Sequence, residues 1–251
     1  MQMEWKYVMA AAAVAITLGT ATSAEAQTSG AASESRWSAD VAIGLDNSIS
    51  GNINSSGLGR IDNQAVVVLK NSYESVYGTG LHFRFGGGYM IDDVTEVRAT
   101  FTFQSLDADL TPLGDIGASK LYAQYADYQS FGLDVGLRRY VDLMPAVRAY
   151  GEGTIGLAFV DETDVVLVAP TTNLAANATD FYDRTAAFTL GGNAGVLVQF
   201  TDKVGVYGQL GLRYVTGMSA VDGLAGTGLE TINDKSARWT VPFIGGVRLR
   251  F

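Results

Sequence analysis

The sequence predicts an all-β fold: an eight-stranded antiparallel up-and-down transmembrane β-barrel with short periplasmic turns and long extracellular loops. Three observations predict it. Eight segments of the 251-residue chain alternate apolar and polar residues, short and long connections alternate between these segments, and the apolar positions carry almost no charge. Because successive side chains of a strand point to opposite faces, each segment would have one apolar and one polar face.

The first four predicted strands cover 37–45, 77–90, 96–105 and 122–139. The first, WSADVAIGL, alternates strictly, and the next two oppose Phe, Leu and Val to His, Arg, Glu and Thr. Long loops are predicted after the first strand, where Gly, Asn and Ser are frequent, and after the third. The segment 65–69, AVVVL, would make a ninth strand. We therefore interpret it as an extension of the second strand above the membrane, or as a hairpin within the first loop.

The last four predicted strands cover 147–160, 187–200, 204–215 and 238–251. The final one places Trp, Val, Phe and Leu on one face, and Thr and Arg on the other. Short turns follow the second, fourth and sixth strands, and long loops follow the first, third, fifth and seventh. An even strand number, with short turns on one side and long loops on the other, is typical of bacterial outer-membrane barrels.

Whether the apolar or the polar face of the strands points inward distinguishes a soluble barrel from a membrane barrel. A soluble barrel turns its apolar face inward, whereas a membrane barrel turns that face toward lipid and keeps a polar interior. A Lys or Arg that faces lipid at mid-depth costs roughly 2–4 kcal/mol, so the near absence of charge on the apolar face favours the membrane barrel. The opposite face carries the predicted lumen charge network: Asp40, His82, Arg84, Glu96, Arg98, Asp134, Arg138, Arg148, Glu152, Arg213 and Arg248, with Arg250 on the same face.

These charges would be confined, because an eight-stranded barrel is just wide enough to be filled by side chains. Buried charges must also be paired or hydrated. Our hypothesis is that Asp40, Glu96, Asp134 and Glu152 neutralise some of the arginines and plug the barrel. The alternative is a narrow hydrated path that one of these pairs gates.

Aromatic residues on the apolar face gather at two heights. This is the expected arrangement at the two interfaces of a membrane barrel. The predicted girdles are Trp37, Tyr89, Phe200 and Phe251 on the turn side, and Tyr77, Phe103, Tyr125, Phe159, Phe188, Tyr214 and Trp239 on the loop side.

Residues 1–26 are typical of a secretory signal peptide. A short basic start precedes an apolar run, and Ala24-Glu25-Ala26 offers a cleavage site. Residues 27–35 are interpreted as a flexible lead-in and 36–251 as the barrel. The net charge of −9 argues against nucleic acid as a partner, and the absence of Cys argues against a disulfide scaffold or a thiolate metal site.

The terminal segment alternates Phe243, Val247, Leu249 and Phe251. Together with the eight strands and the signal sequence, it resembles the small outer-membrane barrel families, such as the OmpA-type transmembrane domain and the opacity proteins. The resemblance covers essentially the whole mature chain, and the chain departs from full-length OmpA-like proteins by ending at the barrel. It implies contact with the lipid of a Gram-negative outer membrane. It also implies biogenesis by the barrel-assembly machinery, for which these four residues would be the assembly signal.

No motif points to a catalytic residue, a metal or a cofactor. His82 is the only histidine, and a hydrogen-bonded lumen residue explains it better than a catalytic base without a nucleophile. Gly151, Gly153 and Gly156 match the dinucleotide fingerprint in spacing, but they lie within a predicted strand, which the fingerprint excludes. The acidic segment 161–164 lacks the ligand spacing of a calcium loop.

The sequence therefore predicts a structural or surface protein that is not an enzyme, with loops exposed outside the cell. Two other roles stay open, a loop-mediated adhesin or receptor and a narrow pore for small solutes. The fold does not choose among them, because function depends on sites and not on architecture.

Overall fold

The computed structural model describes residues 36–170, 174–175, 179–233 and 237–251, which belong to one compact unit. The predicted signal peptide and lead-in lie outside the described residues. Among the residues that are described, no helix is long and apolar enough to cross a membrane.

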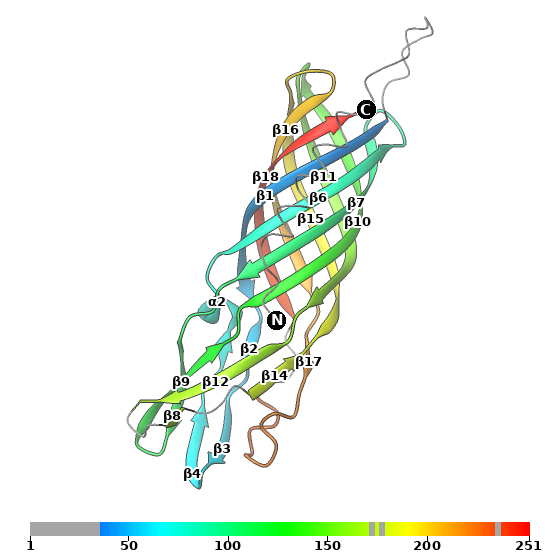
Figure 1. Cartoon of the computed structure of the whole chain (residues 1–251). Helices are drawn as coiled ribbons and strands as arrows, with labels where there is room; N and C mark the ends of the chain where they lie inside the picture. Colours follow the sequence, from blue (N-terminus) through cyan, green and yellow to red (C-terminus); the bar gives the residue numbers. More distant parts are fainter. Residues whose placement is uncertain (1–35, 171–173, 176–178, 234–236) are drawn as a thin grey trace, which may run out of the picture. The chain divides into compact units, whose positions relative to one another are not determined.

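Eight antiparallel strands close on themselves to form a barrel, which confirms the predicted fold class (Figure 1). Around the barrel the order is β1, β18, β16, β15, β11, β10, β7 and β6, and β1 pairs with both β18 and β6. Closure leaves no unpaired strand edge, which a strand structure requires in lipid. The barrel strands are β1 (Trp37–Ser50), β6 (Gly80–Met90), β7 (Thr95–Leu106), β10 (Tyr128–Met144), β11 (Val147–Val160), β15 (Thr185–Gln199), β16 (Val204–Val215) and β18 (Arg238–Arg250).

The predicted strand bounds agree with β11 and β16 and differ most at the fourth strand. A single strand over 122–139 is wrong, because one strand ends at Tyr125 and β10 begins at Tyr128. Between them the Ala126 N–H donates to the Asp164 carbonyl oxygen, at 2.9 Å. The chain is therefore paired with another loop at this point and leaves the line of the barrel strand.

The long loops contain strands, which corrects their interpretation as irregular connections. Eight of these strands form a second antiparallel sheet, which we call the head sheet. Seven of them follow in the order β17 (Ser219–Ala220), β14 (Thr179–Asp183), β12 (Thr163–Ala169), β9 (Ser119–Tyr125), β8 (Thr111–Ile116), β4 (Gln64–Val68) and β3 (Gly57–Ile61), and the eighth, β13 (Leu174–Ala175), pairs with β12. Beside the sheet, β2 (Asn52–Asn54) pairs with β5 (Asn71–Ser72), and the one-turn helix α2 (Tyr73–Val76) follows β5.

The segment 65–69 lies in a hairpin within the first loop, which was one of its two predicted placements. Strands β3 and β4 pair from Gly57–Val68 to Ile61–Gln64. The two turn residues, Asp62 and Asn63, have φ angles of 48° and 62°. Tight hairpins favour a turn with positive φ at both central residues, and Asp and Asn tolerate that conformation best after Gly.

The head sheet encloses an apolar core that includes Val68, Leu113, Leu121, Phe181 and Leu229. The free edge of β3 is covered by the last loop. The Arg60 N–H donates to the Thr227 carbonyl oxygen at 2.7 Å, and the Ser55 N–H donates to the Ile232 carbonyl oxygen at 2.6 Å. A Cβ at Gly59 would overlap the Thr227 carbonyl oxygen, so glycine permits this close approach. The four loops thus pack into one folded body, which we call the head.

Candidate functional site: the charged lumen

Charged side chains fill the barrel lumen in two groups. We call the group nearer the short turns the turn-side cluster and the group nearer the head the loop-side cluster. The turn-side cluster consists of Asp40, Arg84, Glu96, Arg98, Arg138, Glu152 and Arg248, and the loop-side cluster consists of Asp46, His82, Gln104, Asp134, Arg213 and Arg238; all are buried.

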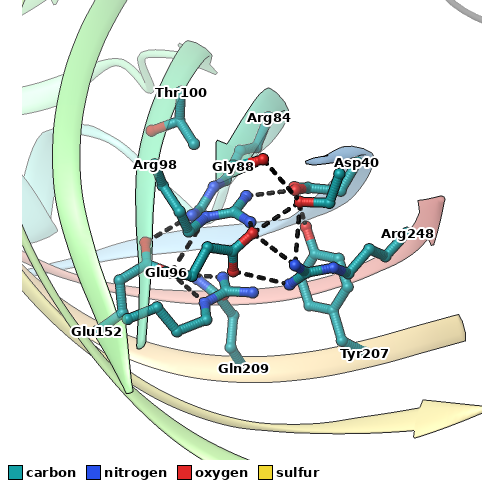
Figure 2. A network of polar contacts seen from close by, with 12 residues as sticks. Asp40, Arg84, Gly88, Glu96, Arg98, Thr100, Glu152, Tyr207, Gln209 and Arg248 are labelled. Carbon is teal, nitrogen blue, oxygen red and sulfur yellow. Dashed lines mark hydrogen bonds and ion pairs between the residues drawn. The ribbon is translucent and has the colours of Figure 1, made fainter. Parts of the chain in front are cut away.

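Glu152 lies at the centre of one half of the turn-side cluster (Figure 2). Its Oε1 accepts a hydrogen bond from Arg84 Nη2 at 2.6 Å, and its Oε2 accepts one from Arg138 Nε at 2.6 Å. Arg98 Nε lies 3.7 Å from the same Oε2. One carboxylate therefore holds three guanidinium groups that come from β6, β7 and β10.

Glu96 occupies the other half of the cluster and is fully buried. Arg248 clamps it with two nitrogens, Nη2 to Oε1 at 2.5 Å and Nη1 to Oε2 at 3.0 Å. The hydroxyls of Ser38 and Tyr140 each donate to Glu96 at 2.7 Å. Charge-assisted, two-pronged pairing of this kind is stronger than a neutral hydrogen bond and fixes the orientation of both groups.

Asp40 completes the cluster. It accepts a hydrogen bond from Arg98 Nη2 and another from the Tyr207 hydroxyl, the latter at 2.9 Å. Strand register explains why these groups meet, because Arg138 lies opposite Glu152 on one neighbouring strand and opposite Glu96 on the other. All four carboxylates of the predicted network thus lie beside arginines, with Asp134 Oδ2 placed 3.4 Å from Arg213 Nη2.

The loop-side cluster is more loosely connected. Gln104 Oε1 accepts a hydrogen bond from Arg238 Nη2 at 3.2 Å, and its amide nitrogen contacts Asp46. The same nitrogen lies 3.3 Å from His82 Nδ1. The Arg238 guanidinium lies 4.0 Å from the ring centroid of Tyr128, which is within range of a cation–π contact. The lone histidine thus sits among lumen polar groups.

Three lumen tyrosines, Tyr140, Tyr150 and Tyr207, are absent from the predicted network, as are Asp46, Gln104 and Arg238. The Arg138 guanidinium lies 4.0 Å from the ring centroid of Tyr150, so the ring packs directly on the cation. All six residues occur at inward positions of their strands, and their parity could have found them. The predicted network contains only charged residues and His82, so the tyrosines and Gln104 are not part of it. Asp46 was missed because β1 continues beyond the predicted end of the first strand.

Arg148 is a correction to the predicted network. Its Nε contacts Asp142 Oδ1 at 2.5 Å, and its Nη2 donates to the Asp93 carbonyl oxygen at 2.8 Å. Both partners lie in or beside short turns, so Arg148 ties two turns together at the mouth of the barrel. Arg148 therefore pairs with Asp142, which is close to it in sequence, and not with the carboxylates of the lumen.

The outer face of the barrel has the opposite character. Along β10 the outward Leu133, Val135 and Leu137 are each about half exposed, while Asp134 and Arg138 on the opposite face are buried in the lumen. Exposed apolar side chains recur in the same way on the other barrel strands. A closed barrel with an apolar exterior and a charged interior is arranged for lipid and not for water. The protein is an eight-stranded transmembrane β-barrel.

Comparisons with known proteins find similarity among solved structures at low identity. No protein-family model matches the chain. No curated protein matches it either. Among solved structures the barrel is similar to Neisserial surface protein A (13% identity, 86% of this chain and 96% of that one, TM-score 0.45), and to Ail, the attachment invasion locus protein of Yersinia pestis (10%, 85% and 99%, TM-score 0.38). It is also similar to the outer membrane protease OmpT of Escherichia coli (8%, 90% and 100%, TM-score 0.46). Likeness at this level assigns none of their roles to this chain.

Nine of the eleven predicted girdle residues point outward from the barrel and two do not; that the nine lie at the two membrane interfaces stays a prediction. Tyr77 and Tyr125 do not face lipid, because both are buried in the core of the head. The Tyr77 hydroxyl donates to the Ala126 carbonyl oxygen, and the Tyr125 hydroxyl donates to Asn54 Oδ1. Tyr77 follows helix α2 and Tyr125 belongs to β9, so neither shares the parity of a barrel strand. The outward positions are Trp37, Tyr89, Phe200 and Phe251 on the turn side, and Phe103, Phe159, Phe188, Tyr214 and Trp239 on the loop side.

The terminal strand presents the four predicted assembly residues on the lipid face. Phe243 and Phe251 are more than 60% exposed, and Val247 and Leu249 are exposed to a lesser degree. β18 also pairs with β1, so this strand closes the barrel. The assembly role of these residues stays a prediction.

The third loop carries an acidic pocket of about 300 Å³, lined by Glu162, Asp164, Asp180 and Asp183. Asp164 lies directly opposite Asp180 in the β12–β14 pair. Partial burial, and then the facing charges of Asp180 and Glu162, raise the pKa of Asp164 above its usual value. Like charges directly opposite each other destabilise a strand pair.

We expect Asp180→Asn to lower the pKa of Asp164 toward its ordinary value. In the wild-type protein the raised pKa means that stability increases as pH falls through the window between the raised and the ordinary pKa. The variant should lose part of that dependence, because the partial burial of Asp164 remains. Carboxyl titration by NMR measures the pKa, and Asp115→Asn, which alters a carboxylate paired with Lys120, is the control. An unchanged Asp164 titration in Asp180→Asn would contradict the assignment of the cause.

Proposed function

We propose that this protein is a non-conducting outer-membrane barrel with a structural or surface role, which anchors the folded head outside the cell. The observation that carries the proposal is the filled lumen. Arg98 and Arg138 are among the largest fully buried side chains of the described residues, and they lie across the turn-side cluster. Their partners come from several strands, so the cluster crosslinks the wall as well as occupying the space within it.

The remaining space in the barrel supports the same proposal. Among the described residues, a cavity inside the barrel has a volume of about 30 Å³, and a cavity within the head core has about 10 Å³. A single water needs roughly 10–15 Å³ measured in this way, so the two cavities hold about two waters and one. A path for small solutes would need the ion pairs of the turn-side cluster to separate. It would also need a passage through the apolar core of the head.

A loop-mediated adhesin or receptor is the second candidate. The segments 107–127 and 161–184, which contribute most of the head sheet, contain nine carboxylates and two cationic side chains. This charge favours a cationic surface or polypeptide as the partner. Such a role adds to that of a surface anchor and does not replace it. We propose neither catalysis nor a cofactor, because His82 contacts the amide of Gln104 within the filled lumen.

Planar-bilayer recording of the refolded protein tests the proposal. We expect no defined single-channel steps, because the ion pairs of Glu152 and Glu96 cross the lumen. Defined steps in the wild-type protein would overturn the non-conducting role and favour the narrow pore. Insertion is checked separately by protease protection of the barrel in the same lipid, so that silence is not mistaken for failure to insert.

A further inference from the structure

The lumen charges of the described residues do not balance. Six arginines and five carboxylates are buried there: Arg84, Arg98, Arg138, Arg213, Arg238 and Arg248 against Asp40, Asp46, Glu96, Asp134 and Glu152. Arginine stays protonated in proteins. Protonation of His82 or of any of the carboxylates would only add to the excess. The lumen therefore holds at least one surplus positive charge, and an uncompensated buried charge is strongly unfavourable.

A cavity lies between the two clusters, beside arginines that contribute to this positive charge. Its lining includes His82, Arg84, Thr102, Asn193 and Arg213, together with Asp134, and its volume is about 30 Å³. Within the described part of the chain, three of the residues that line the cavity each have a buried nitrogen without a hydrogen-bond partner: His82 Nε2, Arg84 Nε and Arg213 Nη1. The two guanidinium nitrogens can only donate, so what they call for is an acceptor.

The structure assigns this cavity to a single small inorganic monoanion, such as chloride or nitrate. The volume of the cavity fits an ion somewhat larger than one water. The unpartnered N–H groups of Arg84 and Arg213 supply charged donors. The anion neutralises the surplus charge that the lumen carboxylates leave. Leu212, Pro242 and Ile244 line the rest of the cavity and limit its hydration. This site goes beyond the proposed surface role and does not depend on it.

The probe is bromide, because it replaces chloride and is located by its anomalous scattering. The full chain is refolded in sodium bromide and crystallised. We expect one bromide peak within hydrogen-bonding distance of Arg213 Nη1 and Arg84 Nε. In solution, unfolding is followed at matched ionic strength in bromide and in gluconate, which is too large for the cavity. A ligand that binds only the folded state raises stability with its concentration, so bromide should stabilise the protein relative to gluconate.

Two substitutions separate a built site from a general salt effect. Arg213→Gln removes one charged donor and should raise the half-stabilising bromide concentration by about tenfold or more, as expected for a hydrogen bond to a charged group. Asn193→Asp places a carboxylate in the cavity, so it should abolish the bromide peak and stabilise the protein in gluconate. This second variant keeps the test usable if Arg213→Gln fails to fold. Lys120→Gln removes an exposed cation of the head and should leave both readouts unchanged.

The proposal fails if the cavity of the bromide crystal shows only water and the wild-type protein is equally stable in the two salts. It fails equally if Asn193→Asp retains the same bromide dependence as the wild-type protein. In that case the halide acts at the surface of the protein.

Discussion

Replacing Glu152 with glutamine should destabilise the barrel by about 3–5 kcal/mol, because breaking a buried ion pair leaves an uncompensated charge. Glutamine keeps the shape of the side chain and removes its charge, while Arg84 and Arg138 stay buried beside it. The free energy of unfolding in lipid vesicles, measured by urea titration in the unfolding and refolding directions, reports the effect. Glu152→Gln combined with Arg138→Gln should recover part of the loss, because one of the unpaired charges is removed with its partner.

The matched control is Asp115→Asn in the head. Asp115 forms an ion pair with Lys120 at 2.7 Å, but the two side chains are 45% and 73% exposed. Exposed pairs contribute about 0–1 kcal/mol, so this variant should stay close to the wild-type protein. Equal losses in Glu152→Gln and Asp115→Asn would show that the lumen pairs do not support the barrel, and the case for a plugged lumen would fail with them.

Replacing Val135 with arginine should destabilise the barrel by roughly 2–4 kcal/mol, the cost of a cation on the lipid face at mid-depth. Val135 points outward from the middle of β10 and is 50% exposed. It lies opposite Ala99 on one side and Ile155 on the other, so no acidic partner faces it directly. The same vesicle unfolding experiment measures the loss, and bilayers with thicker hydrocarbon cores should preserve or increase it.

Leu58→Arg is the control for this prediction. Leu58 is 74% exposed on β3 of the head, where an added cation meets water, and surface substitutions of this kind usually change stability by less than about 0.5 kcal/mol. If Val135→Arg were as harmless as Leu58→Arg, the outer face of β10 would not be in contact with lipid. The assignment of the apolar band would then be wrong.

Much of the barrel could be predicted because the alternation of apolar and polar residues is visible within each strand. The alternation in segments such as 147–160 and 204–215 marks both the strand and its two faces, and the structure keeps those bounds. The same rule failed at 122–139, where β9 of the head and β10 of the barrel follow each other closely in sequence and share one alternating pattern. Tyr77 and Tyr125 show the limit most clearly, since a buried aromatic residue of the head and a lipid-facing one of the barrel look alike in sequence.

The head was the part that sequence reasoning described least well. Gly, Asn and Ser are frequent in the first loop, and acids are frequent in the second and third, so local composition predicts irregular structure. The strands there form because partners from different loops are available. For example, β4 pairs with β8 and β12 pairs with β9. Apolar residues such as Leu113 and Phe181 then become buried in a shared core, which no single loop could enclose.

The sequence by itself determined the fold class, the sign of the two faces and most of the charges inside the barrel, because these depend on local alternation and on the cost of charge in lipid. Only the tertiary structure decided which charged residues pair with each other. Barrel closure and cross-strand register bring Glu152 to Arg84 and Arg138 and pair Arg148 with Asp142. The same packing sets which lumen nitrogens are left without a partner, and so it places the cavity for which we propose an anion. These contacts depend on how whole strands are arranged around the barrel, and no local pattern encodes them.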